Sequence, residues 1–183
     1  EHAVGQRFAV QGQLAWRQLS GGSLDSLVES WHDLFSLPNG SRDRLPRDAL
    51  LIEYRTGAST LLRVDDESSG LADLPLAFGY QLTVSEQGAV ATWLTIKVPA
   101  GKAADLTGSG AVDVALSLAG ERQLSERWQV FGQANVAWLG AGDVLADQQQ
   151  DFAGSLLAGA TWNAWQRLEL TAQLEANTAV LDT

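Results

Sequence analysis

Residues 128–138 read Trp-Gln-Val-Phe-Gly-Gln-Ala-Asn-Val-Ala-Trp. Because successive side chains on a β-strand point to opposite faces, this stretch has one apolar face with tryptophan at both ends and one face of mostly small and amide side chains. About ten residues at roughly 3.3 Å each, tilted by about 40°, rise roughly 25 Å, close to the apolar band of an outer-membrane barrel between its aromatic girdles. The stretch therefore predicts a strand with lipid on one side and water on the other.

The same alternation recurs along the chain and predicts nine strands in one domain over residues 1–183. They are expected at 7–19, 48–55, 60–65, 74–85, 89–98, 111–121, 128–138, 152–162 and 168–181. We interpret them as an all-β, antiparallel, up-and-down transmembrane β-barrel. Since a closed single-chain bacterial barrel normally has an even number of strands, we expect strands to be missing at one or both ends of this sequence.

The connections between these strands alternate between short and long. Short turns are expected at 57–59, 86–88, 122–126 and 164–166, and long loops at 20–47, 66–73, 100–110 and 140–151. This asymmetry is typical of outer-membrane barrels, whose short turns are periplasmic. Pairing across the turns predicts Val84 opposite Val90, Leu118 opposite Val130 and Trp162 opposite Leu168, which keeps the apolar faces together.

Aromatic side chains are expected at both rims of the apolar band. Trp128 and Trp162 are predicted at the short-turn rim, and Trp16, Trp138 and Phe152 at the long-loop rim. Such girdles lie at the two membrane–water interfaces.

Composition limits the remaining classes of protein. The 183 residues carry a net charge of −10, which argues against nucleic acid as a partner because backbone binding needs clustered Lys and Arg. Cysteine is absent, so no disulfide framework and no thiolate metal site is expected. No apolar run is long enough for a membrane-spanning helix.

The first long loop, 20–48, is predicted to carry a short amphipathic helix over about 23–35. Ser26 and Glu29 match a capping box at its start. The helix is expected to pack on the rim or on its own loop, to plug the lumen, or to lie in the membrane interface. The loop or plug candidates are Trp31, His32, Arg42, Arg44 and Arg47. The three arginines are expected either to pair locally with Asp43 and Asp48 or to bind anionic lipid headgroups.

Charged side chains of both signs fall on the parity opposite the apolar face. These lumen candidates are Arg7, Arg17, Glu53, Arg55, Arg63, Lys97, Asp113, Glu121, Glu169 and Glu175. One interpretation is cross-strand pairing that stabilises the wall; the other is ion selectivity along a channel.

No constellation of residues predicts catalysis, a metal or a cofactor. Glu29-x-x-His32 matches only half of a carboxylate–histidine metal motif, and neither a Gly-x-Ser-x-Gly elbow nor a phosphate-binding loop is present. A lipid-modifying enzyme that uses His32 with a nearby serine or acidic residue stays open as an alternative.

Two stretches resemble a known family. The run from Ser20 to Asp43, SGGSLDSLVESWHDLFSLPNGSRD, and the segment 94–113, with Pro99-Ala-Gly-Lys and Gly108-Ser-Gly, are similar to the Gram-negative family labelled domain of unknown function thirty-one eighty-seven. The resemblance touches most of the chain. It implies an outer-membrane-type β-barrel and supplies no reaction, ligand or catalytic residue.

Together these observations predict a protein of the bacterial outer membrane that contacts membrane lipid and lipopolysaccharide. A passive pore or a carrier of small molecules or lipids is the first hypothesis. The alternatives are the lipid-modifying enzyme, a filled barrel that presents its loops, and a soluble β-barrel or sandwich that binds a hydrophobic ligand.

Overall fold

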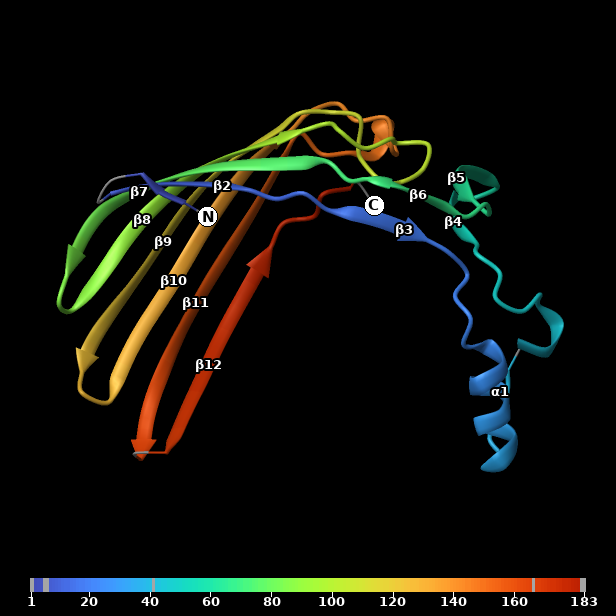
Figure 1. The fold of residues 1–183 in the computed structure, drawn as a ribbon, viewed down its shortest axis with the longest axis horizontal. Helices are drawn as coiled ribbons and strands as arrows, with labels where there is room; N and C mark the ends of the chain where they lie inside the picture. Colours follow the sequence, from blue (N-terminus) through green and yellow to red (C-terminus); the bar gives the residue numbers. More distant parts are fainter. Residues whose placement is uncertain (1, 5–6, 41, 166, 182–183) are drawn as a thin grey trace.

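An eight-stranded antiparallel sheet is the largest part of the computed structural model, which describes residues 2–4, 7–40, 42–165 and 167–181 (Figure 1). The order across the sheet is β1-β2-β7-β8-β9-β10-β11-β12. These strands are β1 (His2–Val4), β2 (Phe8–Gly12), β7 (Leu74–Ser85), β8 (Gly88–Val98), β9 (Asp113–Ser125), β10 (Trp128–Leu139), β11 (Phe152–Trp165) and β12 (Leu168–Asn177). The predicted antiparallel all-β class is confirmed.

The sheet is curved but open. Within the described residues, β1 and β12 are its two edges and do not pair with each other. Figure 1 shows the six long strands β7 to β12 side by side along the arch. The described chain therefore forms a curved wall and not a closed barrel.

The strand predicted over 7–19 is divided into β2 and β3 (Trp16–Leu19). It runs along a partner that is divided as well, because β2 pairs with β7 and β3 pairs with β6 (Ser68–Leu71). Gly12 pairs with Leu76 and Trp16 with Leu71, so three residues (13–15) on one strand lie opposite four (72–75) on the other. This extra residue interrupts both strands at the same level.

The strands predicted at 48–55 and 60–65 form a separate hairpin and are not part of the large sheet. They are β4 (Ile52–Thr56) and β5 (Ser59–Val64), which pair only with each other. Thr56 pairs with Ser59, so the turn has two residues and not the three that were predicted. Gly57 supplies the positive φ of 58° that the turn requires.

The short hairpins of the large sheet are tighter than predicted. Pairing reaches Ser85 with Gly88, Ser125 with Trp128, and Trp165 with Leu168. A register shift accompanies each turn and leaves one strand with an extra residue, respectively Leu82, Leu124 and Ala164. A two-residue turn alone would put the alternating apolar side chains of the two strands on opposite faces of the sheet. The extra residue at each bulge brings them back to the same face.

The bulges explain why the predicted pairs are wrong in detail. Leu118 lies opposite Ala134 instead of Val130, and Trp162 lies opposite Leu170 instead of Leu168. In both cases the apolar faces still coincide. Val84 lies opposite Ala89 instead of Val90, because the shift at Leu82 reverses the alternation next to that turn.

No large apolar side chain is buried among the described residues. The buried side chains other than glycine are small ones: Ala72, Ala111, Ala164, Thr107 and Thr161. By contrast, Leu116, Val136 and Leu156 on the apolar face are 52%, 51% and 59% exposed. The sheet therefore has no hydrophobic core of its own on either side.

The predicted helix is present as α1 (Asp25–Leu34). The predicted capping box is wrong, because the N-cap is Leu24, which makes no side-chain cap bond, and the Asp25 N–H donates to Asp48 Oδ1 at 3.5 Å. Short 3₁₀ turns follow at Arg42–Arg44 and at Ala146–Gln148. Figure 1 shows α1 beyond the β4–β5 hairpin, to one side of the arch, and it packs against no strand.

Candidate functional site

The polar face of the large sheet lies on the inside of its curve. We define this face by the side chains that alternate with the apolar set, such as Ala119, Phe131 and Gln133. A hollow of about 300 Å³ opens on this face over β8 to β11, lined by Ala89, Ala91, Ala119, Gly120, Glu121, Phe131, Gly132, Gln133 and Leu157. Most side chains of this face are half-buried although nothing covers them, because side chains converge on the concave side of a curved sheet.

Polar side chains on this face bond to one another along and across the strands. Asn135 Nδ2 donates to Ser155 Oγ at 2.7 Å, and Gln133 Nε2 donates to Asn135 Oδ1 at 2.8 Å. Lower on the sheet, Gln129 Nε2 donates to Glu121 Oε2 at 2.9 Å. These amide side chains therefore form hydrogen bonds with other side chains of the same face.

The two large aromatic side chains of the polar face lie flat over glycines. Trp93 pairs with Gly79, and Phe131 pairs with Gly159. A Cβ at Gly79 would lie 2.8 Å from the Trp93 ring, and one at Gly159 would overlap the Phe131 ring. The glycines thus let the rings fold against the sheet, as in aromatic rescue of strand glycines, so the rings do not project across the hollow.

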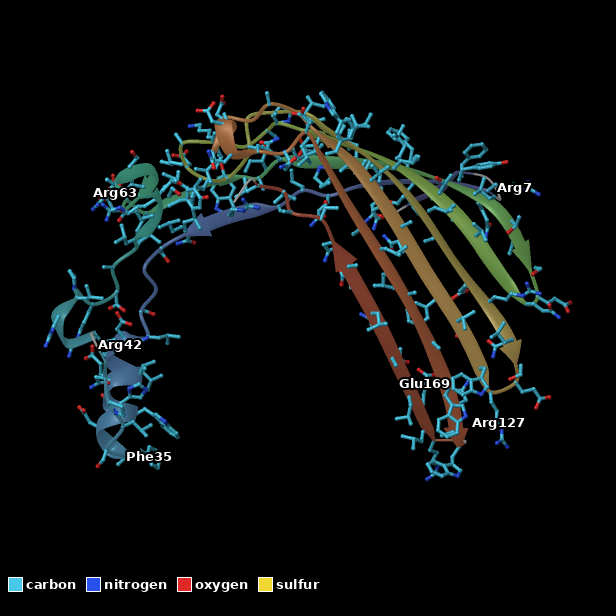
Figure 2. All side chains as sticks on the ribbon, turned by 180° about the vertical axis from the view of Figure 1, so that it is seen from behind. Arg7, Phe35, Arg42, Arg63, Arg127 and Glu169 are labelled. Atoms are coloured by element: carbon cyan, nitrogen blue, oxygen red, sulfur yellow. The ribbon has the colours of Figure 1, made fainter. Side chains whose placement is uncertain are left out.

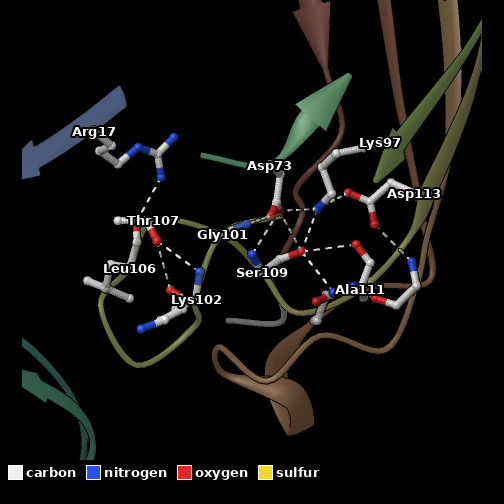
Figure 3. Close-up of polar contacts among 12 residues, drawn as sticks. Arg17, Asp73, Lys97, Gly101, Lys102, Leu106, Thr107, Ser109, Ala111 and Asp113 are labelled. Carbon is white, nitrogen blue, oxygen red and sulfur yellow. Dashed lines mark hydrogen bonds and ion pairs between the residues drawn. The ribbon is translucent and has the colours of Figure 1, made fainter. Parts of the chain in front are cut away.

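A dense polar network closes the long-loop rim around Asp73, between β6 and β7 (Figure 3). Asp73 accepts the backbone N–H of Gly101 at 3.0 Å and that of Ser109 at 2.9 Å. Lys97 Nζ lies 3.2 Å from Asp73 Oδ2 and 2.6 Å from Asp113 Oδ2, and it also donates to Ser109 Oγ. The network fastens loop 99–112 to β8, to β9 and to the connection between β6 and β7.

The Asp73 carboxylate is held in its ionised form. Partial burial by itself raises the pKa of Asp73, but the backbone N–H donors of Ser109 and Gly101 and the Lys97 ammonium outweigh burial and lower the pKa below its ordinary value of 3.8. The Lys97 ammonium lies between two carboxylates and can neutralise only one of them, so the network keeps a net negative charge.

The folded loop 99–112 leaves a cavity of about 580 Å³ at the rim. Arg17 lines it and donates from Nη1 to the Leu106 carbonyl at 2.9 Å, while Thr107 is almost fully buried beside it. Gly101 and Gly108 pass so closely that a Cβ on Gly101 would lie 2.6 Å from the Gly108 nitrogen. The glycines at these two positions are therefore required by close backbone contact.

The structure brings some of the predicted lumen charges together and separates others. Lys97 and Asp113 are register partners and form an ion pair between β8 and β9, which fits the interpretation by cross-strand pairing. Arg55 and Arg63 pair with Glu53 on the separate β4–β5 hairpin, at 3.3 Å and 4.0 Å. Figure 2 shows Arg63 far from Glu169 on β12. The prediction that Glu53, Arg55 and Arg63 line the same wall as Lys97 is wrong for the described sheet, because these strands leave it.

Three further predicted charges lie at or near the concave side of the large sheet. Glu169 and Glu175 are exposed on the polar face of edge strand β12. Arg7 directly precedes β2, and its carbonyl accepts the Gln81 N–H. These residues keep the polar environment predicted for them.

The loop residues are grouped around α1, away from the sheet. The Trp31 and Phe35 ring centroids lie 4.5 Å apart, and His32 Nδ1 lies 2.9 Å from Asn39 Oδ1. Figure 2 shows Phe35 and Arg42 on this side of the molecule. Asn39 is the only hydrogen-bond partner of the His32 imidazole within the described chain, so this ring bonds to neither a serine nor a carboxylate there.

The loop arginines lie close to the helix. Arg42 pairs with Asp25 at 3.4 Å and Arg47 with Glu29 at 2.5 Å, so these two arginines bind carboxylates of α1, where Asp43 and Asp48 were the expected partners. Arg44 is exposed at the end of the 3₁₀ turn. None of the helices in the described part of the chain is both long and apolar enough to cross a membrane.

Four of the five predicted girdle residues meet in pairs. Trp128 lies opposite Trp162 in the register, with ring centroids 5.8 Å apart, and Trp138 lies opposite Phe152 at the other end of the same strands. Trp16 lies on β3, outside the eight-stranded sheet, and is 71% exposed. The aromatic pairs therefore bound the apolar face at both ends.

The rim network was not predicted. Asp73 lies in a segment expected to be a loop, and Ser109 lies within a stretch that resembles the family. The run Gly108-Ser109-Gly110 is the sequence feature that could have indicated it. Closely spaced glycines allow a tight loop, and the backbone N–H groups of such a loop can bind a buried carboxylate. No motif spacing links position 73 to position 109, because they meet only through the fold.

These features define a class of protein: an antiparallel β-sheet wall with one apolar face, one polar face and no buried core. The chain belongs to the family described as protein of unknown function (DUF3187), whose family model matches residues 2–183. No curated protein and no solved structure matches it.

Proposed function

We propose that this chain forms part of the wall of a water-filled β-barrel in the outer membrane of a Gram-negative bacterium. The observation that carries the proposal is the exposure of the apolar face on the convex side of the sheet. Val90, Leu94, Leu116, Leu118, Val136 and Leu156 lie on this face, and no described element packs on it. Hydrocarbon is the solvent in which such a face is stable.

The strand dimensions support the same environment. The pairs Trp128–Trp162 and Trp138–Phe152 bound the apolar face, and ten positions separate Trp128 from Trp138. At about 3.3 Å per residue and a tilt of about 40°, this spacing corresponds to the apolar thickness that transmembrane barrels present. We place the long-loop rim in the leaflet that contains lipopolysaccharide and the two-residue turns at the periplasm.

The open edges of the sheet require a partner in lipid. Unpaired backbone groups at β1 and β12 would cost several kcal/mol each in hydrocarbon, so only a closed sheet is stable there. We propose that further strands join these edges in the intact barrel. The polar face with its flattened rings then lines a hydrated passage for small solutes.

Two measurements test the proposal. The full-length protein should require detergent to stay in solution, and its migration on a gel should change on heating, as for folded outer-membrane barrels. In planar bilayers it should give stepwise conductance. A folded, monodisperse protein without detergent would contradict the membrane assignment, and insertion without conductance would contradict the open passage.

A further inference from the structure

The polar face carries an excess of exposed carboxylates over cations. On β7 to β12 its charged side chains are Lys97, Asp113, Glu121, Glu169 and Glu175. Lys97 is the only cation among them, and it is held by Asp113 and Asp73 at the rim. Arg7, which directly precedes β2 near the concave side, adds one positive charge, so the carboxylates still outnumber the cations by four to two. The charge of this lysine is therefore not available to the rest of the face.

The three glutamates have no cationic partner within the described chain. Glu121 accepts from Gln129, and Glu175 accepts from Asn177 at 3.2 Å, both neutral donors. Glu169 lies opposite Asn163 in the register. Neutral partners leave the full negative charge of each carboxylate in place.

The positions of these glutamates relate them to the space that a solute would cross. Glu121 lines the hollow over β8 to β11, and Glu175 lies opposite Leu157, which lines the same hollow. Because Trp93 and Phe131 lie flat on their glycines, they do not shield these carboxylates. The remaining arginines near this sheet lie elsewhere. Arg127 and Arg167 lie in the turns at the short-turn end, and Arg122 lies opposite Val130, on the apolar face.

We infer that the passage favours small cations over anions, an inference that rests on the proposed pore. Carboxylates of one sign along a narrow wetted surface raise the local concentration of counter-ions and repel co-ions. Cation preference is thus a property of this wall, set by Glu121, Glu169 and Glu175.

The test is the reversal potential of the full-length protein in planar bilayers under a KCl gradient. We expect K⁺ to be about tenfold more permeant than Cl⁻, by the usual scale of counter-ion enrichment. The triple variant Glu121→Gln, Glu169→Gln, Glu175→Gln should bring the ratio close to one. The matched control Glu126→Gln, in the β9–β10 turn, should change it much less.

The outcomes separate this inference from the pore itself. Heat-modifiable migration confirms that each variant is folded before it is measured. Conductance without cation preference, or with a preference that the triple variant leaves unchanged, would overturn the inference and leave the pore intact. Absence of conductance in the folded wild type would overturn both.

Discussion

Trp128 and Trp162 face each other from adjacent strands, with ring centroids 5.8 Å apart and planes only 12° from parallel. Both side chains sit at the short-turn end of the apolar face, and both remain more than a third exposed. Two large rings stacked on each other without cover are suited to an interface where one side is apolar and the other is wet. In the proposed barrel, this pair marks the boundary between lipid and water.

A charge placed on the apolar face tests which solvent surrounds it. Leu118 and Ser117 are neighbours near the middle of β9 that point to opposite faces. We expect Leu118→Arg to lower the free energy of unfolding in lipid vesicles by about 2–4 kcal/mol, since it places a charge in hydrocarbon. The control Ser117→Arg should cost much less, and equal costs for the two variants would contradict the assignment. Denaturant titration in vesicles measures both.

The contact between Phe131 and Gly159 should tolerate no added methyl group. A Cβ at Gly159 would overlap the Phe131 ring and approach the Ala172 carbonyl, whereas one at Gly154 would meet its nearest atom at an ordinary 3.5 Å. We expect Gly159→Ala to cost about 1–3 kcal/mol of unfolding free energy. Gly154→Ala serves as the control, and thermal midpoints of the gel shift compare them. Similar midpoints would show that the ring does not lie on the glycine.

Acid should release loop 99–112. The pKa of Asp73 is lowered in the folded protein, so its contribution to stability is fully present above the ordinary value of 3.8 and is lost as the pH falls through the lowered pKa. Limited pepsin cleavage within the loop should therefore begin only below about pH 4 in the wild type.

The Asp73→Asn variant should be cleaved in the same loop already at higher pH, because it cannot hold Lys97 by charge. Asp66→Asn, at an exposed position on the adjoining segment, is the control and should behave like the wild type. Cleavage of the wild-type loop at a rate independent of pH would contradict the role assigned to Asp73.

Local patterns predicted the sheet well where one strand alone carries the signal. The alternation in residues 128–138 correctly predicted β10 and its two faces, and Trp138 and Phe152 lie at the same end of their strands as expected. The exact register was wrong because bulges at Leu82, Leu124 and Ala164 leave no mark in an alternating pattern. A single extra residue changes the register without changing composition.

Contacts between distant parts of the chain were harder to predict from the sequence. The alternation in β4 and β5 does not reveal that this hairpin leaves the large sheet, since a strand pattern is the same in either place. Likewise, Asp73 meets Ser109 only because the break between β6 and β7 turns the carboxylate toward loop 99–112. Such contacts depend on tertiary structure and not on local preference.

Quenching of tryptophan fluorescence by brominated lipid tests most directly that the apolar face contacts hydrocarbon. Two variants of the full-length protein each keep one tryptophan, Trp138 on the apolar face or Trp93 on the polar face, with phenylalanine at the other positions. In vesicles of lipids brominated close to the headgroup end of the acyl chains, we expect strong quenching of Trp138 and little quenching of Trp93. Equal quenching of the two, or stronger quenching of Trp93, would contradict the account.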